Sequence, residues 1–120
     1  MLSRVTTFDA LKNSGAKPGD VVVIQGVGGL GHLAIQYAKK MGFKTIAISR
    51  GVGKREFAKR LGAQIFIDTE SADVTRELQK LGGAKVILAT FLFNIDYRLY
   101  SIANTFYIIN IIHFNFLYSE

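Results

Sequence analysis

Three glycines at a fixed spacing form the motif with the clearest chemical meaning. Gly26, Gly28 and Gly31 follow the pattern G-x-G-x-x-G between an apolar run and a helical pattern. The first glycine permits a tight turn, the second lets the backbone approach a pyrophosphate, and the third allows close packing of helix on strand. The N–H groups of Gly29 and Leu30 would open the helix, where its dipole favours negative charge. We therefore predict a dinucleotide-binding turn; the alternative is that the glycines only shape a bend.

The end of the next expected strand bears on which dinucleotide would bind. An NAD-specific site usually has Asp or Glu there, accepting from the ribose 2′-hydroxyl, whereas this strand ends in Ser49, followed by Arg50 and then Lys54. No carboxylate is expected to repel a 2′-phosphate, and these three side chains could bind one, Arg50 through forked contacts. NADP(H) is therefore preferred over NAD(H). The alternative is that Arg50 and Lys54 are surface charges next to Glu56.

Short apolar runs alternate with helical patterns around these residues. The periodicity predicts strands at 21–24, 45–49, 65–67 and 86–89, and helices at 29–41, 54–61 and 72–81, with a short upstream helix at 7–14. Such alternation implies a parallel sheet with right-handed crossovers. The expected fold class is α/β, with about four parallel strands and helices on both faces.

Two further polar residues could have either a functional or a structural role. For one of them we favour the structural role, and for the other we weigh the two equally. His32 follows the last motif glycine on the first helical turn, where a packing or partly exposed residue is expected rather than a catalytic one. Asp68 closes the third strand, near where an adenine edge would lie in such folds, and a turn or N-cap role is as good an explanation.

The composition excludes several classes of protein. The chain has no cysteine, which rules out disulfides and Cys-ligated zinc and fits a reducing, cytoplasmic setting. The formal net charge is +6. The basic residues are scattered along helix faces, as at Lys39, Lys40, Lys59 and Arg60, so we expect solvated surfaces and no nucleic-acid partner. No secretory signal is visible at the N-terminus.

Residues 20–90 resemble part of the cofactor domain of zinc-dependent medium-chain alcohol dehydrogenases, in particular the cinnamyl alcohol dehydrogenases. The resemblance lies in the segments 20–39, 54–63 and 67–69, and upstream in 5–11. It implies a partial Rossmann fold that binds NAD(P), in an alcohol or aldehyde oxidoreductase. It also implies that Thr6 and Thr90 lie near the nicotinamide, and that NADP-dependent members carry the serine and the lysine noted above.

The same resemblance implies a catalytic zinc ion held by a separate upstream domain. This chain supplies no such ligands, so the expected catalytic residues and metal ligands are none, and the chain alone is not expected to be catalytic. The resemblance also allows a homo-oligomer, as an expectation for the full-length family. The alternative functions are a non-catalytic dinucleotide-binding remnant and a membrane-attached protein.

The composition changes after Thr90, and we expect a boundary there between residues 1–90 and 91–120. All twelve glycines precede it, whereas the later segment is rich in aromatic residues and asparagine. Residues 99–118 contain no Asp, Glu, Lys or Arg. This uncharged segment has about the length of a bilayer span. A membrane anchor and replacement strands that complete the sheet are two interpretations. The favoured hypothesis is non-native sequence, because AT-rich noncoding DNA encodes this composition when translated.

Overall fold

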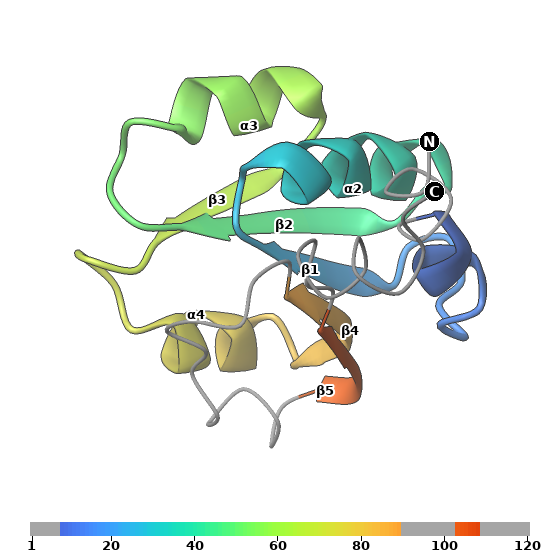
Figure 1. Cartoon of the computed structure of the whole chain (residues 1–120). Helices are drawn as coiled ribbons and strands as arrows, with labels where there is room; N and C mark the ends of the chain where they lie inside the picture. The colour runs from blue at the N-terminus through green and yellow to red at the C-terminus, as the bar shows by residue number, and fades with distance from the viewer. Residues whose placement is uncertain (1–7, 90–102, 109–120) are drawn as a thin grey trace.

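A computed structural model of the chain describes residues 8–89 and 103–108. Within them, one sheet has the strand order β3-β2-β1-β4-β5 (Figure 1). Neighbouring strands are all parallel. The strands are β1 (Val21–Gln25), β2 (Lys44–Ser49), β3 (Ile65–Asp68), β4 (Ala84–Ala89) and β5 (Ala103–Ile108).

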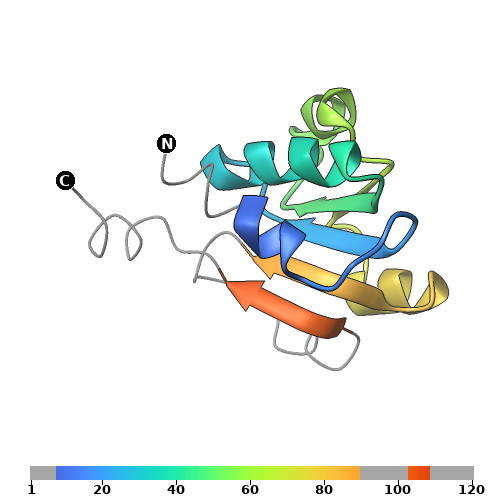
Figure 2. The same ribbon diagram turned by 90° about the vertical axis from the view of Figure 1, so that its right-hand side faces the viewer.

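The helices lie on both faces of this sheet. They are α2 (Gly29–Lys40), α3 (Arg55–Leu61) and α4 (Val74–Lys80), and residues 8–12 form a further helical turn. Figure 1 shows α2 and α3 on one face and α4 on the other, and Figure 2 shows the sheet between these layers. The predicted α/β fold, a partial Rossmann fold of about four parallel strands with helices on both faces, is confirmed, and β5 adds a fifth parallel strand to the sheet.

Two separate apolar cores hold the layers together, because successive strand side chains point to opposite faces. On the α2 and α3 side, the buried residues include Val22, Ile24, Ile35, Phe66 and Leu88. On the α4 side, they include Val23, Ile46, Ile48, Leu78 and Ile87. Both faces of β1 and β2 are therefore covered, which explains their nearly continuous apolar sequences.

The helix ends follow local chemistry, and one of them corrects a predicted boundary. Helix α4 begins two residues later than expected because Asp73 is its N-cap, accepting a 3.4 Å hydrogen bond from the N–H of Arg76. Helix α3 ends at Leu61, and its C-cap Gly62 has φ +126° and donates its N–H to the carbonyl of Ala58. The positive φ explains why glycine ends this helix.

Strand β5 comes from the segment for which we favoured a non-native origin. Its residues pair in register with β4, for example Val86 with Thr105 and Leu88 with Tyr107. For residues 103–108 the structure thus agrees with the interpretation of a strand that extends the sheet, while the origin of residues 91–120 stays a hypothesis. In the ranges that the structure describes, no helix combines the length and apolarity needed to cross a membrane.

Candidate functional site

The glycine motif forms the turn from β1 into α2, as predicted. Gly26 has φ +100°, a left-handed conformation that favours glycine, and its N–H donates to the carbonyl of Ile48 at 2.8 Å. The turn is therefore tied to β2 where it leaves the sheet. The next residue, Val27, is buried with its side chain in the core on the α2 side.

The other two motif glycines differ in what surrounds them. A Cβ on Gly31 would overlap the carbonyl oxygen of Gly26, so only glycine lets α2 approach β1 this closely. A Cβ on Gly28 would meet nothing within 4 Å, and its φ of −119° does not require glycine. The packing of the chain thus explains Gly31 but not Gly28.

Helix α2 starts on this turn without a side-chain cap. Gly28 is the N-cap residue, and the N–H of His32 donates to its carbonyl at 2.8 Å. The N–H groups before His32 have no partner within the helix, as at any helix start. The first turn also contains no acidic residue. The positive end of the helix dipole therefore meets no acidic side chain from that turn, and this favours an anion.

The end of β2 differs from the prediction in one respect. Ser49 ends the strand and Arg50 follows it, as expected, but Arg50 Nε lies 3.5 Å from Glu70 Oε2. A Cβ on Gly51 would lie 3.2 Å from Glu70 Oε1, so this carboxylate sits over the loop after β2. The strand itself ends without a carboxylate, as expected. The carboxylate of Glu70 nevertheless lies beside Arg50 in the folded chain, so the expectation that no carboxylate is nearby is wrong. Glu56, suggested as the neighbour of Arg50, is not its partner.

The Asp68 side chain links the loops after β2 and β3 by hydrogen bonds. It is 6% exposed, and its Oδ1 accepts from the N–H groups of Gly51 at 2.7 Å and Glu70 at 2.9 Å, while Oδ2 accepts from Ser71 Oγ at 3.1 Å. The Glu70 N–H above all, with the other two donors and the charge of Arg55, holds the pKa of Asp68 below its ordinary value, although burial acts the other way. Of the two roles weighed for Asp68, the structure thus shows the turn role.

Lys54 reaches back to the glycine-rich turn. Its Nζ donates to the carbonyl oxygen of Val27 at 2.9 Å, linking residues 27 positions apart. Its backbone is the N-cap of α3, where its carbonyl accepts from the N–H of Ala58. The sequence suggested a phosphate contact or a surface charge for Lys54, and neither interpretation included this link.

The remaining predicted residues fall in two groups. Thr6 and Thr90 lie outside the described residues. His32 is partly exposed and stacks on Phe57 of α3, with ring centroids 5.9 Å apart, which confirms its packing role. The predicted surface cations Lys39, Lys40, Lys59 and Arg60 are all exposed.

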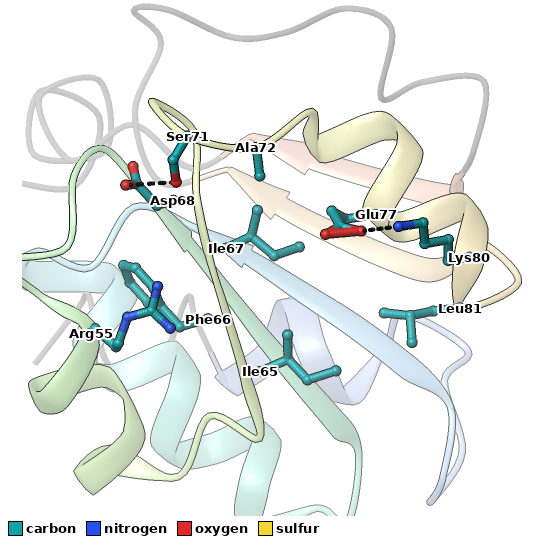
Figure 3. Close-up of a pocket in the computed structure, with 10 residues that line it drawn as sticks. All are labelled: Arg55, Ile65, Phe66, Ile67, Asp68, Ser71, Ala72, Glu77, Lys80 and Leu81. Carbon is teal, nitrogen blue, oxygen red and sulfur yellow. Dashed lines mark hydrogen bonds and ion pairs between the residues drawn. The ribbon is translucent and has the colours of Figure 1, made fainter.

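A cavity of about 330 Å³ lies along the outer edge of the sheet beside β3 (Figure 3). Its lining comes from β3, the loop after it and α4, with Arg55 from α3. Arg55 lies over the ring of Phe66, 5.3 Å from its centroid. The cavity meets the candidate site only at Asp68 and Ser71 and has no wall from the glycine-rich turn, so we do not assign the diphosphate to it.

No cluster of three or more potential metal-ligating His, Asp or Glu side chains occurs in the part of the chain that the structure describes. The described residues thus do not fit a zinc ion. A parallel sheet with a glycine-rich strand-to-helix turn defines instead a Rossmann-type domain.

Residues 29–93 match the family model for zinc-binding dehydrogenases. The chain belongs to this family, which confirms the predicted relationship to part of the NAD(P)-binding domain of zinc-dependent alcohol dehydrogenases. The alcohol dehydrogenase patD of Aspergillus clavatus is 51% identical over 86 residues, covering 72% of this chain and 22% of that protein. An alcohol dehydrogenase of Geobacillus stearothermophilus is 46% identical over 87 residues, covering 72% and 26%. The chain thus spans about a quarter of the length of these relatives.

Two solved structures share the fold. The CAD from Helicobacter pylori, crystallised with NADP(H), has a TM-score of 0.73 at 25% identity, covering 90% of this chain and 30% of that one. The alcohol dehydrogenase TADH from Thermus sp. ATN1 has a TM-score of 0.78 at 25% identity, covering 92% and 34%.

The same substitution is predicted to have very different effects on stability at Gly31 and at Gly28. Gly31→Ala should lower the free energy of unfolding by about 3 kcal/mol, because the new methyl group overlaps the Gly26 carbonyl. Gly28→Ala should change it by no more than about 0.5 kcal/mol, because its methyl group meets no atom. Urea unfolding of the full chain measures both, and equal losses would contradict the described turn.

The hydrogen bonds of Asp68 predict a dependence of stability on pH. Because its folded pKa is lowered, the ionised group stabilises the fold fully above its ordinary pKa of about 3.9, and this contribution is lost as the pH falls toward the lowered folded value. Asp68→Asn should therefore be less stable than the unmodified chain at pH 7, with a gap that narrows below pH ~4. Urea midpoints from pH 7 to 3 test this, with exposed Asp9→Asn as the control; a gap independent of pH would contradict it.

Proposed function

We propose that the chain binds a nicotinamide dinucleotide at the glycine-rich turn, as the NADP(H)-binding portion of an alcohol or aldehyde oxidoreductase. The observation that carries the proposal is the contrast between Gly31, which the packing of the chain requires, and Gly28, which it does not. Close approach of a diphosphate explains a glycine at Gly28, where a side chain would stand between the ligand and the backbone. The start of α2, whose first N–H groups have no partner within the helix, would hold the phosphate charge.

The end of β2 supports a preference for NADP(H). Ser49 and Arg50 lie where an adenosine ribose would reach in a Rossmann domain, and Lys54 follows in the same loop. A 2′-phosphate there would compete with Glu70 for the guanidinium of Arg50. Since exposed ion pairs contribute only about 0–1 kcal/mol, a doubly charged phosphate can displace Glu70. The NADP(H) complex of the similar CAD supports the same choice.

The nicotinamide end and the catalytic apparatus remain proposals by family resemblance. Thr6 and Thr90 are the proposed contacts near the ring, and a bound nicotinamide would supply hydride transfer. The catalytic zinc of the family needs ligands that this cysteine-free chain does not provide, so we propose that the chain alone does not reduce aldehydes. We also propose that the protein is located in the cytoplasm and that residues 91–120 are non-native sequence.

Titration of the full chain with NADPH, followed by nicotinamide fluorescence or calorimetry, tests the diphosphate site. The unmodified chain should bind, and Gly28→Ala should weaken binding by about tenfold or more, because the methyl group occupies the position that the phosphates approach. The stability of Gly28→Ala, measured separately, is the control for folding. Binding of Gly28→Ala as tight as that of the unmodified chain would place the diphosphate elsewhere.

A pair of substitutions tests the selectivity. Arg50→Glu should weaken NADPH by about tenfold or more and leave NADH nearly unchanged, because it sets a carboxylate against the 2′-phosphate. Glu70→Gln should tighten NADPH by up to about fivefold, since it releases Arg50 from its ion pair. Tighter binding of NADH than of NADPH to the unmodified chain would show that NADP(H) is the wrong cofactor.

A further inference from the structure

The hydrogen bond from Lys54 to Val27 falls on the peptide unit that forms the glycine-rich turn. The peptide joining Val27 to Gly28 is planar and trans, so its carbonyl and its N–H point in opposite directions. Lys54 Nζ holds the carbonyl oxygen at 2.9 Å from the α3 side. The direction of the Gly28 N–H is therefore fixed by a side chain that lies far along the sequence.

The Val27–Gly28 peptide is restrained by core packing on its Val27 side but not on its Gly28 side. Before it, the side chain of Val27 is buried in the core, with 3% of its surface exposed. After it, Gly28 is exposed and has no side chain to limit its rotation. Rotation of the Val27–Gly28 peptide would point the carbonyl, rather than the N–H, at a bound diphosphate.

Lys54 is itself well placed for this task. Its backbone is fixed as the N-cap of α3, and α3 is held by buried Ala58 and by the stack of Phe57 on His32. An ammonium group has three donors, so one bond to Val27 leaves two for other acceptors. A charged donor to a carbonyl is also stronger than a neutral one.

We infer that Lys54 is a positioning residue for the diphosphate, acting through the Val27–Gly28 peptide, and is needed for the binding of both NADPH and NADH, which share that diphosphate. The inference rests on the proposed function and deepens it. The role proposed from the sequence, a contact with the 2′-phosphate, would affect NADPH alone. Loss of the positioning role affects NADH equally, so the two roles are separable by experiment.

The test compares Lys54→Met with Lys54→Arg and Lys59→Met in the full chain, by titration with NADH and with NADPH. Lys54→Met removes the donor and should weaken both dinucleotides by about tenfold. Lys54→Arg keeps a charged donor and should recover most of that loss. Lys59→Met removes the same charge from an exposed position on α3 and should stay within about twofold of the unmodified chain.

A second readout follows the turn itself in the absence of dinucleotide. In ¹H–¹⁵N spectra, the amide signal of Gly28 should shift and broaden in Lys54→Met, because the peptide gains a second orientation, and should stay unchanged in Lys59→Met. Weakening of NADPH alone, with an unchanged Gly28 signal, would overturn the inference. Failure of the unmodified chain to bind either dinucleotide would refute the proposed function, and an unchanged Gly28 signal would then refute the positioning role as well.

Discussion

The contact between Gly31 and the carbonyl of Gly26 is the constraint on which the rest of the site depends. It sets how near the first turn of α2 comes to the end of β1, since a methyl group at Gly31 would overlap that oxygen. The hydrogen bond from Gly26 to Ile48 ties the same turn to β2. Two backbone contacts thus fix where the start of α2 lies relative to β1 and β2.

Three loops meet around this turn because neighbouring parallel strands end at one edge of the sheet. The register pairs Gln25 with Ile48 and Ser49 with Asp68, so the segments after β1, β2 and β3 follow one another across that edge. Single side chains then join them: Lys54 connects the loop after β2 to the glycine turn, and Asp68 connects the loops after β2 and β3. These two hydrogen bonds therefore join three separate parts of the chain at one edge of the sheet.

The sequence predicted the features that depend on neighbouring residues, but not the contacts between residues far apart along the chain. The elements of residues 21–89 follow from local periodicity and glycine spacing, and they were predicted with shifts of a few residues at their ends. Partners chosen across the sheet were missed, namely Glu70 for Arg50 and Val27 for Lys54. The strand register would have revealed Glu70, because a residue just past Asp68 must lie near one just past Ser49. Strand β5 lies in the segment for which strands were one interpretation but not the favoured one, because the change in composition after Thr90 was explained by non-native sequence.

The strand order also has a consequence for how this domain folds while it is being synthesised. Strands β1, β2 and β3 are neighbours in both sequence and space, whereas β1 must wait for β4 on its other side. Until α4 and β4 have been synthesised, Val23, Ile46 and Ile48 have nothing to cover them, because their burial depends on Leu78 and Ile87. A nascent chain that has just completed β3 thus presents a bare aliphatic strip and an open strand edge, which favour aggregation. Translation of the short stretch from Asp68 to Ala89 is the interval in which a chaperone would protect it most.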